Sequence, residues 1–284
     1  MSHSAGLAWT DAKITFEDAK DWKKMSELFE NETPKWEPGT AVGYHALTYG
    51  WLVDQIIRRV DPKHRSIGQF FREEFQQPLG LDLHIGLPKS EAYRVARIRL
   101  PSFFQRISEF VHNPDAVNYP KFLYEFAIDG MISKVEKNPD WLRFVKEMTL
   151  NNPEIYELEQ GAVMGTSTAK SLAKLFSIAI IEKKMFKEET IQKMLTPFNQ
   201  SKDLVTGALV SRGQGFMFTD FQTCSGIKCR VIGHSGYGGQ NIKFDPKYKV
   251  SFAYLSNGLK AGFGDSARTF VRLRDSIYDV LTKN

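Results

Sequence analysis

The pattern of hydrophobic and polar positions changes once along the 284 residues of the chain. Up to about residue 195, apolar residues recur at helical spacing between proline-rich breaks. Leu47, Trp51, Ile56 and Val60 are an example, because their spacing predicts one apolar helix face. After about residue 205, apolar and polar residues alternate and glycines are frequent, which is typical of short strands. The pattern therefore predicts a mostly helical first part and a sheet in the second.

Helix boundaries in the first part are indicated by caps and prolines. Ser66 is a suitable N-cap for a helix that we expect Pro78 to stop. The stretch 166–185 has the strongest helical pattern and starts at a Thr/Ser cap. Further helical segments are expected in short pieces, in the stretches 94–104, 119–135 and 138–150.

Four short strands are predicted in the second part. They lie in the stretches 213–221, 228–236, 239–246 and 249–257. The sequence "DPKYK" is a turn between the last two strands, which makes them a hairpin. Residues 265–283 form a closing amphipathic helix, capped by Asp265 or Ser266. Consecutive strands followed by one helix indicate an α+β fold with an antiparallel sheet, not a parallel βαβ fold.

Composition limits the class of protein. With 42% hydrophobic and 25% charged residues, the chain can bury a sizeable core, as one large domain or as two lobes. The longest apolar run, residues 176–181, is far shorter than the roughly 20 residues of a membrane helix. The first residues lack a basic stretch followed by an apolar one, so no signal peptide is indicated. We expect a soluble protein with no membrane span, and the cytoplasm is the favoured location.

Charge and cysteines suggest neither a nucleic-acid partner nor a metal. The net charge is +5, but the basic residues are scattered, as expected of solvated faces and helix C-termini. Cys224 and Cys229 could pair across a hairpin, but we expect them to stay reduced, and without nearby histidines they make a poor zinc site. No metal or organic cofactor is expected, because the sequence has neither ligand-spaced clusters nor a phosphate loop.

The first candidate for chemistry is "PGTAVGYHALTYGW". Pro38 and Gly39 set a turn, and Tyr44 and His45 follow at a helix entrance. A tyrosine can act as a general base there only if nearby cations lower its pKa from about 10. The alternative is a packed tyrosine beside a capping histidine.

The second candidate is "IGHSGYGGQNIKFDP", in which a predicted strand runs into His234, Ser235, Gly236 and Tyr237. Closely spaced glycines let a substrate lie against the strand edge, and free N–H groups there can hold an oxyanion. The alternative is an ordinary glycine-rich hairpin turn. The esterase elbow G-x-S-x-G is disfavoured, because Tyr237 takes the place of its last glycine and a strand follows instead of a helix.

Taken together, five segments in one order carry a resemblance to a known family. These segments are "MSHSAGL", "GYHALTYGWL", "FFREEFQQPLGLDLHIGLP", "TSTAKSLAKLF" and "GHSGYGG". In this the chain resembles the serine β-lactamase and penicillin-binding-protein superfamily, most closely class C β-lactamases and β-lactamase-like esterases. The resemblance implies a single domain over 1–284, incomplete at its N-terminus, with a mostly helical lobe (1–200) and antiparallel strands with a C-terminal helix (201–284).

The resemblance also implies roles for individual residues. Tyr44 matches the tyrosine of the family's Tyr-x-Asn motif, which moves protons to and from the nucleophilic serine, while Ala46 replaces its asparagine. Residues 234–236 match the Lys-Thr-Gly element, with His234 in place of the lysine. Tyr237 would supply an oxyanion donor through its backbone N–H, and we place His45 in the substrate-binding group beside Tyr44. Both departures favour small-molecule esters, amides or peptides over penicillins and cephalosporins.

The family's nucleophile is a Ser-x-x-Lys serine in a helix that precedes the loop matched by "MSHSAGL". The resemblance therefore implies that this helix, together with the first strands of the sheet, is missing from the 284 residues. About one or two such strings are expected by chance. Three Ser-x-x-Lys strings do occur in the chain, at Ser167/Lys170, Ser171/Lys174 and Ser225/Lys228. We favour none of their serines as the nucleophile, and we do not favour Ser235 either.

Two hypotheses follow from these motifs. In the first, the chain is a truncated or alternatively started serine hydrolase that turns over little by itself. In the second, it is a non-catalytic binding or scaffold protein that retains the pocket. The sequence leaves the physiological substrate and the oligomeric state open.

Overall fold

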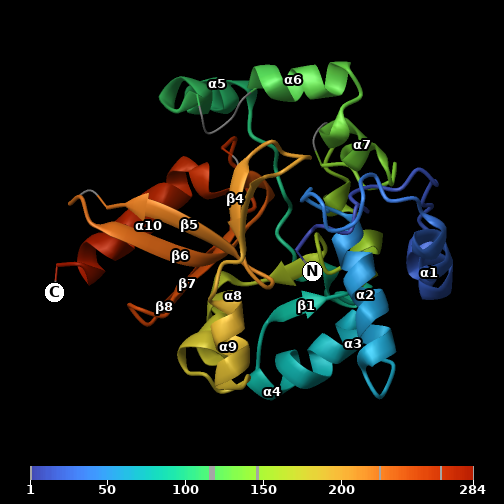
Figure 1. The fold of residues 1–284 in the computed structure, drawn as a ribbon, viewed down its shortest axis with the longest axis horizontal. Coiled ribbons are helices and arrows are strands. Elements are labelled where there is room, and N and C mark those ends of the chain that lie inside the picture. Colours follow the sequence, from blue (N-terminus) through green and yellow to red (C-terminus); the bar gives the residue numbers. More distant parts are fainter. Residues whose placement is uncertain (1, 115–118, 145–146, 224, 263, 284) are drawn as a thin grey trace. The chain divides into compact units, whose positions relative to one another are not determined.

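The computed structural model describes residues 2–114, 119–144, 147–223, 225–262 and 264–283 (Figure 1). The chain forms two compact units, and each is assembled from three separate segments of the sequence. Unit 1 consists of Met1–Ile98, Pro120–Ser167 and Lys202–Leu209. Unit 2 consists of Arg99–Tyr119, Thr168–Ser201 and Val210–Asn284.

Helices are the main regular elements of unit 1. Its α-helices are α1 (Trp22–Asn31), α2 (Thr48–Val60), α3 (Ile67–Phe71), α4 (Gln77–Leu79), α6 (Tyr119–Ala127) and α7 (Met131–Lys137). Short helical turns lie at Asp18–Lys20, Arg72–Gln76, Lys89–Arg94, Thr149–Asn151 and Pro153–Glu157. Two strands that the sequence pattern did not predict, β1 (Leu83–Ile85) and β2 (Gly165–Ser167), pair antiparallel, with Leu83 opposite Ser167.

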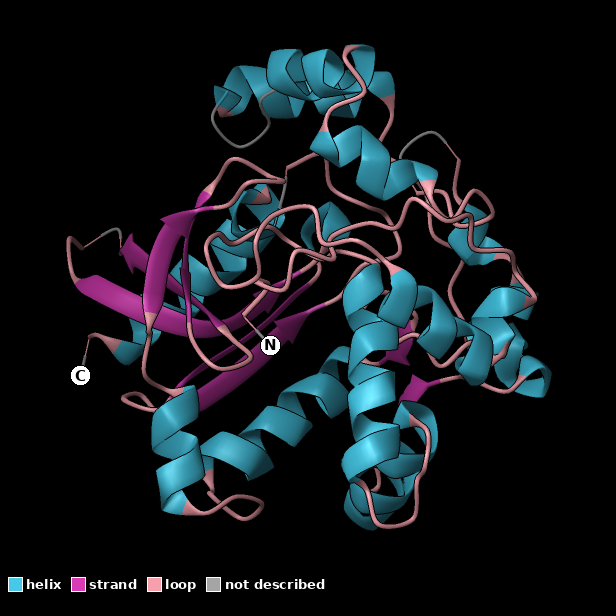
Figure 2. Ribbon diagram, turned by 45° about the vertical axis from the view of Figure 1, so that its right-hand side comes forward, coloured by secondary structure: helices cyan, strands magenta, loops and turns pink. Residues whose placement is uncertain are grey.

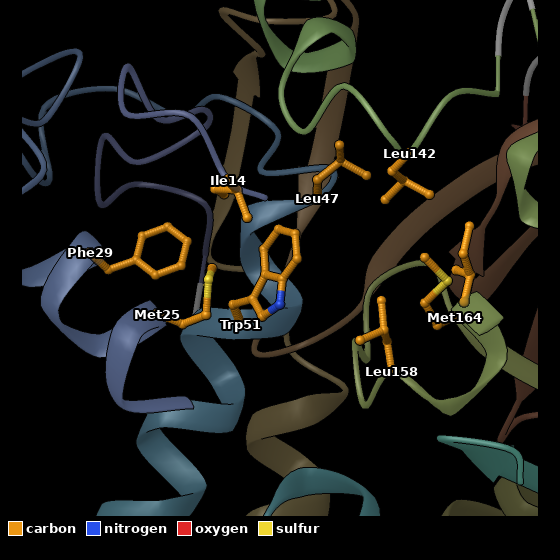
Figure 3. Close-up of a cluster of buried hydrophobic side chains, with 9 residues drawn as sticks. Ile14, Met25, Phe29, Leu47, Trp51, Leu142, Leu158 and Met164 are labelled. Atoms are coloured by element: carbon orange, nitrogen blue, oxygen red, sulfur yellow. The ribbon is translucent and has the colours of Figure 1, made fainter. Parts of the chain in front are cut away.

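The main core of unit 1 gathers around Trp51 of α2 (Figure 3). Met25 and Phe29 reach it from α1, and the Phe29 and Trp51 rings lie 6.5 Å apart, centroid to centroid. Leu142 and Leu158 complete it from segments much later in the sequence. Each such side chain stabilises the fold by about 1.5–3 kcal/mol when it leaves water, so α2 is held by long-range contacts.

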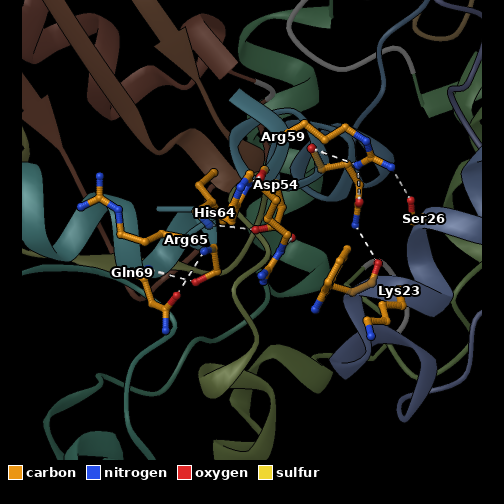
Figure 4. A network of polar contacts seen from close by, with 12 residues as sticks. Lys23, Ser26, Asp54, Arg59, His64, Arg65 and Gln69 are labelled. Atoms are coloured by element: carbon orange, nitrogen blue, oxygen red, sulfur yellow. Dashed lines mark hydrogen bonds and ion pairs between the residues drawn. The ribbon is translucent and has the colours of Figure 1, made fainter. Parts of the chain in front are cut away.

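The predicted apolar face of α2 is only partly correct. Trp51 is buried, but Ile56 and Val60 are 47% and 70% exposed. The buried side of the helix instead continues through the polar residue Gln55, whose Nε2 donates to the backbone oxygen of Trp22 at 2.9 Å. Figure 4 shows the polar network that joins α2 to α1 through Arg59 and Ser26. Polar side chains therefore take positions where the sequence pattern expects apolar ones.

The start of α3 confirms the predicted cap, but its continuation corrects the predicted stop. Ser66 Oγ accepts from the N–H of Gln69 at 3.1 Å, and Gln69 Oε1 accepts from the N–H of Ser66 at 3.2 Å. The helical path passes Pro78 and ends at Gly80, whose φ is +56°. Pro78 lies in the first turn of α4, directly after a π-turn, where a missing N–H is tolerated.

Unit 2 contains a sheet with strand order β3-β4-β5-β6-β7-β8. The strands are β3 (Asn199–Lys202), β4 (Leu209–Arg212), β5 (Met217–Gln222), β6 (Lys228–Ser235), β7 (Asn241–Asp245) and β8 (Val250–Tyr254). The last four confirm the predicted strands, and all neighbours from β4 to β8 pair antiparallel. Strands β3 and β4 were not predicted. The α-helices of unit 2 are α5 (Phe103–His112), α8 (Ala169–Phe176), α9 (Glu188–Met194) and α10 (Arg268–Leu281).

Both faces of this sheet are covered by helices (Figures 1 and 2). Val231 packs with Phe270 and Tyr278 of α10, whereas the next residue, Ile232, packs with Ala179 after α8. Neighbouring residues of a strand point to opposite faces, so α10 covers one face and the α8 segment covers the other. Strand β6 therefore carries apolar side chains on both of its faces.

The caps of the two covering helices differ in how well the sequence predicts them. Thr168 caps α8 as expected, since its hydroxyl accepts from the N–H of Ser171. The cap predicted for the last helix is wrong: α10 begins after Ala267, and no side chain caps it. A short turn, Gly264–Ser266, precedes it, and the Asp265 carboxylate turns to Lys243 instead.

Two further predictions concern cysteines and membranes. Cys229 is a free, buried thiol on β6, and burial raises its pKa. Its predicted neighbour Cys224 lies outside the described residues. Among the described helices, none has both the length and the apolar character that a membrane-spanning helix needs.

Candidate active site

The first candidate stretch folds in unit 1 against the loop Ser2–Leu7. The N–H of Gly43 donates to the His3 oxygen at 3.0 Å, and the N–H of Gly39 donates to the Ser4 oxygen at 2.8 Å. Thr48, the first residue of α2, donates its hydroxyl to the Leu7 oxygen at 2.6 Å. The loop is thereby fixed on the segment that carries Tyr44 and on the N-terminus of α2.

His45 holds these two segments together. Its ring is buried, with Nδ1 2.6 Å from the Gly43 oxygen and Nε2 accepting from the N–H of Leu7 at 3.0 Å. Nε2 is an acceptor in this arrangement, so the ring proton sits on Nδ1 and the imidazole is neutral. Burial lowers the pKa of His45, in keeping with that state. The geometry gives His45 a positioning role, and its contact with a substrate stays a prediction.

Tyr44 is half-buried next to His3, a residue that the sequence analysis did not single out. The two ring centroids are 5.0 Å apart in an edge-to-face arrangement, and the His3 ring is also 4.8 Å from that of Tyr49. His3 Nδ1 accepts from the N–H of His45 at 3.1 Å. His3 has a φ of +62°, which is uncommon for a residue other than glycine. It thus sets the surroundings of Tyr44, and its place in "MSHSAGL" was the signal available in the sequence.

The second candidate stretch lies in unit 2, at the end of β6. The N–H of Gly236 donates to the Gln240 oxygen at 2.7 Å, which closes a tight turn over Tyr237–Gly239. Gly238 has a φ of +71°, and a side chain there would collide with Leu259. Gln240 fixes the turn to the segment after β8 by two hydrogen bonds with the backbone of Ser256. The stretch therefore forms a glycine-rich turn in which Gly238 is required by the backbone, and its role in holding a substrate stays a prediction.

His234 and Ser235 are the last two residues of β6, opposite Ile242 and Asn241 of β7. Burial lowers the pKa of His234, and the positive charge of Lys243 lowers it further. The imidazole is consequently neutral at pH 7, unlike the lysine that the family resemblance puts in this position. Ser235 faces the Gly264–Ser266 turn, since a side chain on Gly264 would lie 2.7 Å from the hydroxyl oxygen of Ser235.

A buried ion pair that sequence reasoning missed supports this strand end. The Lys243 side chain is 0% exposed, and its Nζ lies 2.8 Å from Asp265 Oδ2. Thr219 also donates its hydroxyl to that carboxylate oxygen, at 2.5 Å. Burial lowers the pKa of Lys243 even though Asp265 favours the charged form. The alternation of β7 marked Lys243 only as a polar strand position.

The serines of the three Ser-x-x-Lys strings lie in other elements than β6. Ser167 is in β2, and its hydroxyl donates to the Asp82 oxygen at 3.2 Å. Ser171 is buried in the first turn of α8. Ser225 is in a turn between β5 and β6, where its hydroxyl lies 2.9 Å from that of Thr223. Within the described ranges, no group of three or more His, Cys, Asp and Glu side chains could hold a metal ion.

The candidate residues thus fall into two groups. Unit 1 brings together His3, Tyr44 and His45, and unit 2 brings together His234 and residues 235–237. A family model described as Beta-lactamase matches residues 1–276. The chain belongs to the beta-lactamase family. The match confirms the serine β-lactamase and penicillin-binding-protein superfamily that the motifs indicated.

Known relatives include esterases as well as β-lactamase-like proteins. The beta-lactamase family chain is 39% identical over 274 residues to the esterase/beta-lactamase LipL of Mycobacterium tuberculosis, covering 91% of this chain and 58% of LipL. It therefore spans little more than half the length of that curated relative.

Solved structures show the same fold. A penicillin-binding-protein homologue from Caulobacter crescentus is similar with a TM-score of 0.75 and 28% identity. A family VIII carboxylesterase has a TM-score of 0.75 and 25% identity. Both alignments cover 98% of this chain and 69% of the other. The predicted α+β fold of the β-lactamase/transpeptidase type is confirmed.

Proposed function

We propose that this beta-lactamase family chain is part of a serine hydrolase that acts on small, uncharged esters, with amides and peptides as the neighbouring substrate classes. The observation that carries the proposal is His234, a neutral imidazole in the place of the family's lysine. A fixed cation at this point suits an anionic substrate group such as a β-lactam carboxylate, and a neutral ring does not. Ala46 stands where the family motif has an asparagine, so the amide that would contact a β-lactam side chain is missing. This also favours simple esters over β-lactams.

In the proposed reaction, a serine hydroxyl adds to the ester carbonyl carbon. Its proton passes through Tyr44 to the leaving alcohol, so the C–O bond to the alcohol breaks and an acyl-serine remains. Water then releases the acid by the reverse proton path. The backbone N–H of Tyr237 is the proposed donor to the carbonyl oxygen as it becomes negative. We propose that His3 positions Tyr44 through their ring contact, and that His45 supports His3 through its backbone N–H.

The proposed reaction needs a nucleophilic serine, and the 284 residues contain no Ser-x-x-Lys string at the position where the family has it. The serines of the three Ser-x-x-Lys strings sit in a strand, a helix turn and a hairpin turn, none of which is the family's nucleophile helix. We therefore propose that the chain by itself hydrolyses esters slowly or not at all. The second candidate function, a non-catalytic binding or scaffold protein, is favoured by this same observation.

The first prediction separates the two functions. The 284-residue chain, and the same chain preceded by a family segment that carries Ser-x-x-Lys, are assayed with p-nitrophenyl butyrate and with a chromogenic cephalosporin. We expect ester turnover and fluorophosphonate labelling only in the extended chain. Tyr44→Phe in the extended chain should lower kcat by about 100-fold or more, because the proton carrier is lost.

Two controls make the result decisive. Replacing the serine of the added segment by alanine should abolish labelling. Tyr93→Phe, at an exposed tyrosine far along the sequence from the candidate stretches, should leave kcat unchanged. An extended chain that folds but neither reacts with the label nor hydrolyses the ester would favour the binding function. Cephalosporin turnover above ester turnover would contradict the role given to His234.

A further inference from the structure

The segment directly before helix α5 combines arginines with a serine. Ser102 has arginines three and five residues before it, Arg99 and Arg97, and an apolar residue, Phe103, directly after it. Among all serines and threonines of the 284 residues, only Ser102 has an arginine three residues before it. The pattern therefore singles out one hydroxyl group of the chain.

The structure leaves this serine and the side chains of the pattern at the surface. Arg97, Arg99 and Ser102 are exposed, and Phe103 is 70% exposed. Residues 96–102 lie outside the helices, and the backbone at Arg99 forms a β-bridge. An enzyme that binds an extended segment of chain can therefore reach these side chains from solvent.

Two arginines at this spacing before a serine suit one class of partner. In an extended segment, residues two positions apart point to the same side, so both guanidinium groups can meet one acidic surface. A guanidinium group binds a carboxylate through two parallel, charge-assisted hydrogen bonds. Protein kinases select their substrates by such charge patterns. The pattern indicates a basophilic serine kinase, in which acidic side chains bind the arginines before the serine.

We propose that Ser102 is a phosphorylation site, modified by a basophilic serine kinase that recognises Arg97 and Arg99. The Ser102 hydroxyl oxygen attacks the γ-phosphorus of ATP, a new O–P bond forms, and the bond from that phosphorus to ADP breaks. The hydroxyl proton passes to the catalytic aspartate of the kinase. The proposal is independent of the proposed hydrolase activity, since it uses residues outside both candidate stretches of the active site.

The start of α5 accommodates a phosphate on this serine. Ser102 Oγ accepts from the N–H of Gln105 at 3.3 Å, so the modified side chain keeps an acceptor oxygen beside the first turn. Arg106 follows Gln105, and its Nε donates to the oxygen of Pro101, next to the modified residue, at 3.2 Å. A phosphoserine carries a charge of about −1.5 to −2 at pH 7, which a helix N-terminus and a guanidinium group both stabilise. We therefore expect α5 to persist after the modification.

The second prediction measures phosphate incorporation into the folded 284-residue chain. A purified basophilic serine kinase, supplied with Mg²⁺ and ATP labelled at the γ-phosphorus, should transfer about one phosphate per chain. Peptide mapping by mass spectrometry should place that phosphate on Ser102. Ser102→Asn should abolish the labelling, because asparagine keeps the helix cap but has no hydroxyl group. Ser102→Thr keeps both the cap and a hydroxyl group and should be labelled.

Recognition of the two arginines is measured separately. Arg97→Ala and Arg99→Ala should each lower the kcat/KM of the kinase by about tenfold or more, because hydrogen bonds between charged groups are lost. Arg272→Ala, at an exposed arginine of α10, is the matched control and should leave kcat/KM within about twofold. Ser108→Ala, at an exposed serine of α5 without an arginine three residues before it, should leave the labelling unchanged.

Three outcomes would overturn the proposal. The first is no labelling of the folded chain; labelling of a synthetic peptide of residues 94–107 in the same assay would then assign the failure to the fold. The second is labelling that Ser102→Asn retains. The third is labelling that Arg97→Ala and Arg99→Ala slow no more than the Arg272→Ala control does. Circular dichroism confirms folding of each variant, and the exposure of the replaced side chains makes loss of folding unexpected.

Discussion

His45 and His234 are both histidines of predicted motifs, and burial lowers the pKa of each. They nevertheless do different things. His45 bonds two backbone groups with its two ring nitrogens, so its ring is committed to joining the Leu7 loop to the Gly43 segment. His234 lies one residue before the end of β6, next to a glycine-rich turn, in the position where the family resemblance puts a lysine. At the scale of single residues, the same side chain is structural in one unit and a candidate for chemistry in the other.

The third prediction concerns His45→Phe. The substitution leaves the Leu7 N–H and the Gly43 oxygen without their side-chain partner, so the free energy of unfolding should fall by about 1–3 kcal/mol at neutral pH. The measurement is urea denaturation. His112→Phe, at an exposed histidine of α5, should change it by less than about 0.5 kcal/mol.

The pH dependence of the same pair of proteins tests the protonation state. Because the pKa of His45 is lowered on folding, the unfolded chain binds a proton below about pH 6.5 that the folded chain does not. The contribution of His45 is therefore present above that pH and is lost as the pH falls through its folded pKa. The stability difference between the unchanged chain and His45→Phe should shrink at about pH 5; a growing difference would show that His45 is charged in the folded protein.

At the scale of elements, strands and turns are joined by polar contacts as well as by the core. Lys243 of β7 and Thr219 of β5 both reach Asp265 in the turn before α10. Asn241 Nδ2 donates to the oxygens of Gly239 and Gly264, which links that turn to the glycine-rich one. The Lys243–Asp265 ion pair therefore fixes the position of the 264–266 turn beside Ser235. Its effect on the end of β6 is indirect.

The fourth prediction is that Lys243→Met lowers the free energy of unfolding by about 3 kcal/mol, because the Asp265 carboxylate loses its buried partner. Lys243→Met/Asp265→Leu should recover most of that loss, since neither charge then remains. Lys228→Met, at an exposed lysine in the same sheet, is the control and should have an effect below about 0.5 kcal/mol. Equal destabilisation by the single and double variants would refute the pairing.

At the scale of the whole molecule, the two units are interleaved in sequence. Each is built from three segments, so neither can unfold without releasing chain that closes loops in the other. All five tryptophans, Trp9, Trp22, Trp36, Trp51 and Trp141, belong to unit 1, and unit 2 has none. Tryptophan fluorescence therefore reports on unit 1 alone.

The fifth prediction uses this distribution. Urea unfolding followed by tryptophan fluorescence and by far-ultraviolet circular dichroism should give coincident midpoints, because interleaved segments make unfolding cooperative. The far-ultraviolet dichroism signal also includes the contribution of the sheet and of α10 in unit 2. Two separate midpoints would show that the units unfold independently despite their shared segments.

The sequence by itself determined the features that depend on a few neighbouring residues. Ser66 and Thr168 cap their helices because a cap needs only the next turn, and strands β5 to β8 follow from alternation and from glycine-rich turns. The order of five motifs also gave the family. The motifs named Tyr44 and the strand end at His234, and the roles of these residues in catalysis stay predictions.

Tertiary structure decided the features that depend on distant segments. Burial of the Lys243 charge beside Asp265 and the bond of His45 Nε2 with the N–H of Leu7 each require a partner that lies far along the chain. Local patterns misjudged α2, where Gln55 is buried and Val60 is exposed, for the same reason. Hydrophobic spacing indicates that a helix has an apolar side, but only packing against the rest of the chain determines whether that side faces a core or water.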